Sequence, residues 1–230
     1  STSINTNRLI SDQGQATGGG LLNQGDAELR ECEVDGNSAS SSSSGAFGGG
    51  IANAPGASLK AYSTSINTNR VVSDQGRAQG GGLRTDGDAE LRECEVDGNS
   101  ASSSSSDAFG GGVVNSFAAR FAAHATSISN NRVTSVSGTV VLGAGLYHDG
   151  AFPALLNGSW LIGNLVSGGN NESLTVGGNN IFNGANISYV LPAPLGHWAP
   201  GAVECREITC ANNLPCLNQP CDLSTLPQLE

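Results

Sequence analysis

The chain has 230 residues, a formal net charge of −10 and a pI near 4.6. This acidic balance argues against nucleic-acid binding, which needs a clustered basic surface, and no apolar run approaches the about 20 residues of a transmembrane helix. With 33 glycines, 5% aromatic residues and no Met, the composition disfavours a helical core of large side chains.

The first elements of the chain return later in it. Residues 1–14, STSINTNRLISDQG, recur with two changes at 63–76, and residues 26–44 recur identically at 88–106, a period of 62 residues. So exact a period predicts a fold built by stacking one unit. Because the chain lacks Met and opens within a repeat, we expect it to be part of a longer or processed protein.

A shorter repeat divides each unit into two rungs. Gly-rich triplets stand at 18–20, 48–50, 80–82 and 110–112, with a degenerate GAG at 143–145. An aliphatic residue followed three positions later by Asn precedes each triplet; the asparagines are Asn7, Asn37, Asn69, Asn99 and Asn131, and Leu161/Asn164 continues the series. The step alternates between 30 and 32 residues, and the interval from Asn to Gly stays at 11 through the first four rungs.

Strand periodicity within the rungs predicts an all-β fold. The run 31–35, ECEVD, places Cys32 and Val34 on one face and three carboxylates on the other,. Short strands, frequent turns and a step of 30–32 residues predict a parallel β-solenoid of six or seven rungs over residues 1–188, regular to about 165,.

Stacking accounts for the residues at the corners and in the interior. We expect the asparagines to form a ladder at a tight corner, in the left-handed backbone conformation that Asn tolerates. Gly triplets mark a corner where positive φ or close backbone approach excludes a Cβ. The interior is expected to hold Val34 and its equivalents, joined by the position two residues earlier: Thr2, Cys32, Thr64, Cys94 and Thr126.

Charge alternates between the two rung types. The acidic clusters are Glu31, Glu33 and Asp35, repeated as Glu93, Glu95 and Asp97, while the rung between them carries Ser63, Ser65 and Asn67. Alternation separates stacked carboxylates by about 10 Å, roughly one Debye length. Arg8, Arg70 and Arg132 lie only on the less acidic rungs, which predicts cations interleaved with anions.

The serine runs 40–44 and 102–106 fall within the constant Asn-to-Gly interval. We expect them on the rung, as a strand or tight turn of small side chains. A flexible linker is the alternative that their composition alone suggests.

The motifs GGGL at 18–21, GGGI at 48–51, GGGL at 80–83 and GGGV at 110–113, together with aliphatic-x-x-Asn, resemble the polymorphic outer-membrane protein repeats. That family consists of right-handed parallel β-helix surface proteins, so the resemblance implies a right-handed β-helix and a role in adhesion or matrix building. The segment 189–198, YVLPAPLGHW, resembles the end of β-helix regions in large algal and protist surface proteins.

Residues 189–230 form a second region that is rich in Pro and Cys. Its cysteines are Cys205, Cys210, Cys216 and Cys221, whose clustering predicts two disulfides in an oxidising compartment and an irregular cap on the solenoid,. Three pairings stay open, and a zinc site is the alternative. Cys32 and Cys94 lie two rungs apart, about 10 Å, beyond disulfide reach, so we expect buried free thiols.

Three sequons, at Asn157, Asn171 and Asn186, are candidate glycosylation sites, and their place outside the strict repeats favours exposed loops,. Duplication of the acidic clusters argues for a solvated face rather than an active site, with weak calcium binding as an alternative. His124, His148 and His197 show no spacing typical of a metal site or a catalytic triad,. We therefore predict no catalytic residue, metal or cofactor in this segment.

The resulting hypothesis is an extracellular structural or adhesive segment of a larger cell-surface, matrix or filament protein. Its expected partners are other subunits, copies of itself or extracellular glycans, with membrane attachment only through regions outside this segment. The alternative is a carbohydrate-active β-helix enzyme whose catalytic rungs lie outside this segment.

Overall fold

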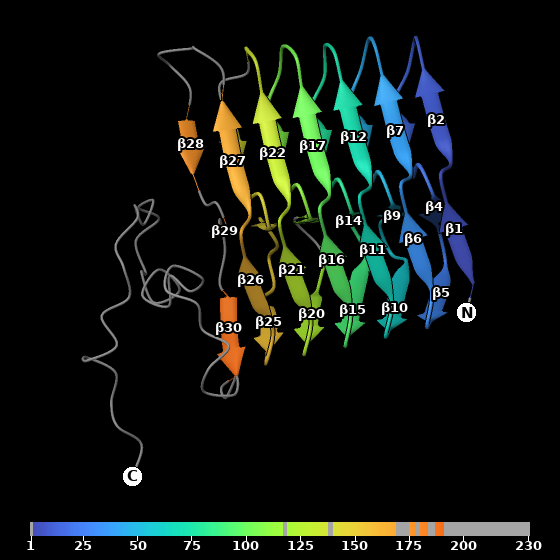
Figure 1. The fold of residues 1–230 in the computed structure, drawn as a ribbon, viewed down its shortest axis with the longest axis vertical. Coiled ribbons are helices and arrows are strands. Elements are labelled where there is room, and N and C mark those ends of the chain that lie inside the picture. Colours follow the sequence, from blue (N-terminus) through green and yellow to red (C-terminus); the bar gives the residue numbers. More distant parts are fainter. Residues whose placement is uncertain are drawn as a thin grey trace.

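The chain winds through five parallel β-sheets that repeat in the same order on each turn (Figure 1). The structure, a computed structural model, describes residues 2–116, 119–137, 140–168, 175–177, 180–183 and 187–190. Each sheet is six strands deep, and the chain makes about five turns between its first and last rungs. No helix occurs among the described residues, so this part of the chain contains no helix that could span a membrane.

We number the sheets in the order in which one turn visits them. Sheet 1 contains β1 (Ser3–Asn5), β6 (Glu33–Asp35), β11 (Ser65–Asn67), β16 (Glu95–Asp97), β21 (Ser127–Ser129) and β26 (Trp160–Ile162). Sheet 2 contains β2 (Arg8–Ser11), β7 (Ser38–Ser41), β12 (Arg70–Ser73), β17 (Ser100–Ser103), β22 (Arg132–Ser135) and β27 (Leu165–Gly168). Sheet 3 contains β3 (Ala16–Thr17), β8 (Ala46–Phe47), β13 (Ala78–Gln79), β18 (Ala108–Phe109), β23 (Val140–Leu142) and β28 (Thr175–Gly177).

The last two sheets complete the turn. Sheet 4 contains β4 (Leu21–Asn23), β9 (Ile51–Asn53), β14 (Leu83–Thr85), β19 (Val113–Asn115), β24 (Leu146–His148) and β29 (Ile181–Asn183). Sheet 5 contains β5 (Asp26–Arg30), β10 (Ser58–Tyr62), β15 (Asp88–Arg92), β20 (Phe121–His124), β25 (Ala154–Asn157) and β30 (Ile187–Val190).

This architecture confirms the predicted all-β parallel solenoid. The register follows the predicted alternation, because Ser3 pairs with Glu33 and Glu33 in turn pairs with Ser65. Ladder contacts accordingly link residues 30 and 32 positions apart in turn. The predicted C-terminal cap lies outside the described residues.

The described residues form three buried hydrophobic clusters, and the two larger ones fill the interior of the rungs. Sheets 1, 4 and 5 enclose a large lobe filled by side chains such as Val34, Ile51 and Leu59. Sheets 2 and 3 enclose a small lobe whose buried cluster contains only Ala and Val, for example Ala39 and Ala46. Because these side chains are small, the two sheets of the small lobe can lie close together.

The two lobes meet at a waist where the asparagine ladder contacts the glycine triplets. The third glycine of each triplet lies against the Asn amide of the next rung: a Cβ added to Gly50 would lie 2.8 Å from Asn69 Cγ. The second glycine lies against backbone, so that a Cβ on Gly81 would lie 2.5 Å from Ser100 O. The predicted close approach at the triplets is therefore a contact between the two sides of the solenoid, from the triplet of one rung to the asparagine corner of the next.

The buried asparagines are stacked, and their amides are fully hydrogen-bonded. Asn69 Oδ1 accepts from Asn37 N at 2.9 Å and from Asn37 Nδ2 at 3.0 Å. Asn69 Nδ2 donates to Val34 O at 2.8 Å and to Asn99 Oδ1 at 3.0 Å. The same pattern repeats at Asn99 and Asn131, whereas Asn7 is exposed at the first rung. Four bonds per amide meet the full capacity of the group, which makes its burial tolerable.

The left-handed backbone was predicted at the asparagines, and that prediction was wrong. Positive φ occurs at the preceding residue: Thr6, Gly36, Thr68, Gly98, Asn130 and Gly163. The asparagine must instead direct its amide inward, and its own N–H donates to the Oδ1 of the next rung. At the triplets, the first glycine takes positive φ, as at Gly48 and Gly80.

The serine runs belong to the rungs, as expected. Ser41 ends β7 and is buried, and the following residues form a bend. Ser41 Oγ donates to Gly14 O at 2.6 Å and accepts from Ser44 N at 3.1 Å. Ser73 and Ser103 repeat this pattern, which joins the outer turns of the small lobe from rung to rung.

Replacing Asn69 by Ala should lower the free energy of unfolding by at least about 3 kcal/mol, because each buried group left without a partner costs about 1–3 kcal/mol. Asn7→Ala is the matched control at the exposed end of the same ladder and should cost clearly less. Urea denaturation followed by circular dichroism measures both; equal losses would contradict the burial argument.

Candidate functional site

The predicted acidic clusters form part of the outer surface. Glu33 and Glu95 are exposed, and Asp35 and Asp97 are half-buried. Asp97 Oδ1 accepts from Ser129 Oγ at 2.9 Å and from Asn130 Nδ2 at 2.7 Å. The aspartates thus link neighbouring rungs. Among the described residues, no group of three or more His, Cys, Asp or Glu side chains is arranged to hold a metal ion.

The predicted interleaving of arginines with these carboxylates is not seen as ion pairing. None of the ion pairs in the described part of the chain involves Arg8, Arg70 or Arg132. These arginines begin the strands of sheet 2, beyond the corner that follows sheet 1. The arginines are exposed and lie on a different sheet from the carboxylates.

The interior position two residues before Val34 holds buried Cys and Thr in alternation from Cys32 to Thr126, whereas Thr2, predicted to be interior, is exposed on the first rung. Cys32 and Cys94 are free and buried, as expected from their two-rung separation. The hydroxyl of the Thr on the next rung accepts from the cysteine N–H, for example Thr126 Oγ1 from Cys94 N at 3.3 Å. The four cysteines at 205, 210, 216 and 221 lie outside the described residues.

The sequon at Asn157 does not lie in the exposed loop that was expected. Asn157 ends β25 and is half-buried, and its Nδ2 lies 3.4 Å from His124 Nδ1. Ser159 of the same sequon is buried and accepts from Thr126 N at 3.1 Å. Asn171, Asn186 and His197 lie outside the described residues. His148 is fully buried, 2.8 Å from Asn115 Nδ2.

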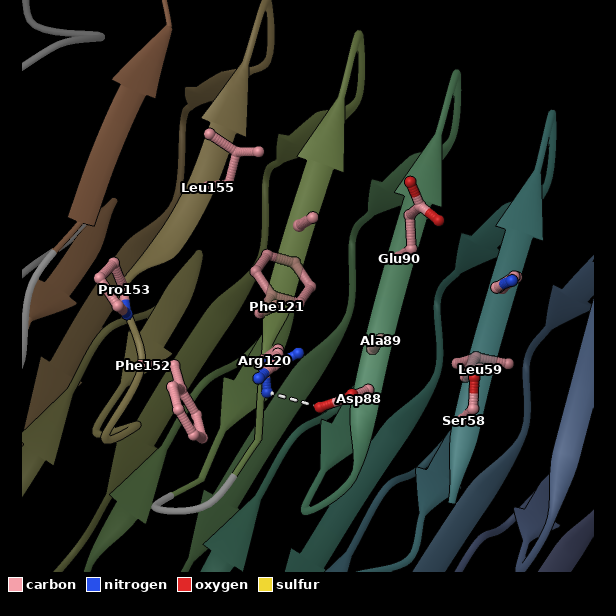
Figure 2. Close-up of a pocket in the computed structure, with 12 residues that line it drawn as sticks. Ser58, Leu59, Asp88, Ala89, Glu90, Arg120, Phe121, Phe152, Pro153 and Leu155 are labelled. Atoms are coloured by element: carbon pink, nitrogen blue, oxygen red, sulfur yellow. Dashed lines mark hydrogen bonds between the residues drawn. The ribbon is translucent and has the colours of Figure 1, made fainter. Parts of the chain in front are cut away.

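The strongest candidate site is a groove on the outer face of sheet 5, which we call the outer groove (Figure 2). It has a volume of about 470 Å³ and crosses β10, β15, β20 and the start of β25. Its exposed lining consists mainly of Ser58, Lys60, Asp88, Glu90, Arg120, Ala122, Phe152, Pro153 and Leu155.

The groove exists because the outward side chains in one column, the same strand position on successive rungs, differ in size and charge from rung to rung. The paired positions Lys60, Glu90, Ala122 and Leu155 follow one another on successive strands. The small Ala122 leaves a depression between Glu90 and Leu155. Phe152, 42% exposed on the loop before β25, forms one wall.

The polar rim of the groove is held by local contacts. Asp88 Oδ1 accepts from Arg120 N at 3.1 Å, and the Arg120 guanidinium lies 4.9 Å from the Phe152 ring centroid (Figure 2). Glu90 accepts from Arg92 Nε at 2.7 Å and lies 3.6 Å from His124 Nε2. The site therefore combines an apolar floor with fixed carboxylates and cations, an arrangement typical of a binding surface.

The sequence reasoning missed this site. The run DAELR at 26–30 and 88–92 alternates outward charges with inward Ala and Leu, a period-two signal for a charged strand,. The apolar half of the groove comes from Ala122 and from a loop in the third, degenerate unit. No sequence spacing relates Phe152 to Asp88.

Comparison of the chain with protein family models, with curated proteins and with solved structures finds no match. The comparisons thus assign no family, and the function must be argued from the solenoid and its surfaces.

The Cys94 thiol should be unreactive in the native protein, because burial raises its pKa and closes access,. Alkylation of the native chain, followed by peptide mapping, should leave Cys32 and Cys94 unmodified until denaturant is added. Rapid labelling of either residue in the native chain would contradict the described burial.

The same shift predicts an alkaline loss of stability. A thiol whose folded pKa is raised contributes stability that is present below the unfolded pKa, about 8.5, and is lost as pH rises through the folded pKa. Cys94→Thr restores the residue found on neighbouring rungs and should remove this part of the loss. Unfolding free energies measured at pH 7.5 and pH 10 give the comparison; equal pH dependence in both proteins would refute it.

Proposed function

We propose that the chain is a structural and adhesive segment of a larger extracellular, cell-surface, matrix or filament protein. It acts through protein–protein or protein–glycan contacts made on the outer groove. The observation that carries the proposal is that groove, a concave surface with an apolar floor and a polar rim on an otherwise repetitive scaffold. The motif resemblance to polymorphic outer-membrane protein repeats supports the surface location and the right-handed helix.

The scaffold suits this role because packed and hydrogen-bonded side chains fill its interior, which leaves the outer surface for contacts with partners. The Asn, Ser and Cys/Thr ladders satisfy buried polar groups from rung to rung, and the two cores fill the lobes. A stack of this kind keeps outward residues on neighbouring strands at a fixed separation of about 4.8 Å. Rigid spacing lets several weak contacts act together on one extended partner.

The groove favours a partner with both apolar and polar groups. Phe152 and Leu155 offer apolar surface, while Asp88 on β15 and Lys60 on β10 supply an acceptor and a donor farther along the groove. Sugar rings and extended peptides both present such mixed faces. Candidate partners are therefore extracellular glycans, other subunits and further copies of this chain.

Ala122→Lys should abolish partner binding without unfolding the protein, because it reproduces the Lys60 found in the same column. Phe152→Ala should weaken binding about tenfold, the usual effect of removing an anchoring aromatic residue. Val136→Lys, at a residue 64% exposed on another part of the surface, adds the same charge and should leave binding unchanged.

The assay is binding of the full chain to a panel of soluble polysaccharides, together with sedimentation of the chain alone to detect self-association. Groove-dependent binding or association supports the proposal. The proposal is overturned if both groove variants bind as well as the parent protein, or if neither polysaccharide binding nor self-association is detected. Release of new reducing ends from a polysaccharide would instead favour the carbohydrate-active enzyme.

A further inference from the structure

A second concave surface follows the glycine corner between sheets 3 and 4, and we call it the furrow. It has a volume of about 420 Å³, and its key residues are Arg77, Gln79, Arg84, Asp86, Phe109 and Tyr147. The first glycine of each triplet lies at its base: a Cβ on Gly80 would lie 2.8 Å from Arg84 N. This glycine has positive φ, which L side chains rarely adopt.

The furrow forms a candidate binding site only on the middle rungs, because the residues beside the glycines differ from rung to rung there. In the sheet 4 column, Ala52 is followed by Arg84, Val114 and Tyr147. In the sheet 3 column, Gln79 stands between Phe47 and Phe109. Arg84 lies with its guanidinium 4.2 Å from the Phe47 ring centroid, and this contact holds it against the furrow wall.

Charges within the furrow are compensated in pairs. Arg84 Nη2 lies 2.9 Å from Asp86 Oδ2, and Arg77 Nε lies 3.7 Å from Asp107 Oδ2. Asp149 is the second carboxylate of the lining, which therefore holds two arginines and two aspartates, and it hydrogen-bonds the Tyr147 hydroxyl. An anion would therefore face Asp86 and Asp149, and a cation would face both arginines. Neither charge is favoured, so the furrow suits a neutral ligand.

The polar groups of the furrow supply donors and acceptors side by side. Arg84 donates, Asp86 accepts, and Gln79 can do both. Burial and the nearby Asp149 raise the pKa of Tyr147 to about 12, so its hydroxyl stays protonated at neutral pH. A hydroxyl-rich ligand matches this set, because each hydroxyl donates once and accepts twice.

An aromatic wall completes the site. The rings of Phe109 and Tyr147 lie with their centroids 4.8 Å apart; Tyr147 is half-buried and forms the accessible part of the wall, while Phe109 and Val114 are buried and support it. A pyranose has one face of C–H groups that can pack on such a wall while its hydroxyls reach the polar side. The volume of the furrow falls within the about 300–1,000 Å³ typical of small-molecule sites.

We propose that the furrow binds an uncharged sugar residue, with Arg84, Asp86 and Gln79 holding its hydroxyls and the Phe109–Tyr147 wall packing against its ring. The furrow shares no lining residue with the outer groove, so this inference stands or fails independently of the proposed function.

The repeat itself supplies variants that should fold. Arg84→Ala reproduces Ala52, and Tyr147→Val reproduces Val114, each from the same column. Arg70→Ser is the matched control, because it removes an exposed arginine and reproduces Ser38 and Ser100 in the column of sheet 2. Circular dichroism and thermal unfolding of each full-length variant verify the fold.

Saturation-transfer-difference NMR on the full chain provides the test, with glucose, galactose and N-acetylglucosamine as neutral probes. Glucuronate and glucosamine serve as the anionic and cationic probes. At least one neutral sugar should bind about tenfold more tightly than its charged counterpart, the effect expected from an uncompensated charge. Arg84→Ala and Tyr147→Val should each weaken it about tenfold, and Arg70→Ser and Phe152→Ala should not change it.

Four outcomes overturn the inference. No neutral sugar binds at millimolar concentration, or the charged probes bind as well as the neutral ones, or both furrow variants retain full binding while folded. Loss of binding in Phe152→Ala alone would place the sugar in the outer groove and would also contradict the furrow assignment.

Discussion

The structure depends on the contact between stacked asparagine amides and glycine triplets across the waist of each rung. The amide of Asn69 uses all four of its hydrogen-bonding positions, and Gly50 leaves room for it by having no side chain. A larger residue on either side would push the lobes apart. Because every rung repeats this contact, the register of the whole stack is set at one line through the molecule.

The waist also explains why the surface can vary. Because the waist contact fixes the centre of each rung, the small lobe is filled by Ala and Val alone, and the larger apolar side chains lie in the large lobe. Outward positions are then free to change from rung to rung. Lys60, Glu90 and Ala122 share one column, as do Ala52, Arg84 and Val114, and these changes create the outer groove and the furrow.

The sequence predicted the repeat geometry well because stacking converts spacing directly into register. The spacing of Asn37 from Asn69 gave the rung length, and the alternation around Val34 gave the inward face. It did not predict that the 11-residue interval encloses a separate lobe, since that depends on a contact across the rung. A glycine before the asparagine, such as Gly36, is a sequence signal for a left-handed backbone. Alternate rungs carry Thr at the same position, as at Thr68, so the signal is not repeated on every rung. The groove and the furrow combine residues from different rungs, and no single-rung motif contains them.

The most direct test of the waist is to place a methyl group there. Gly81 does not have positive φ, so Gly81→Ala adds only a steric conflict, with the backbone of Gly111 and Ser100 on the next rung, whereas a Cβ on Gly25 would meet nothing within 4 Å. Urea unfolding should show Gly81→Ala destabilised by at least about 2 kcal/mol, or failing to fold, as expected for overpacking. Gly25→Ala should stay within about 1 kcal/mol of the parent protein. Equal stability of the two variants would contradict the claim that the waist contact holds the fold.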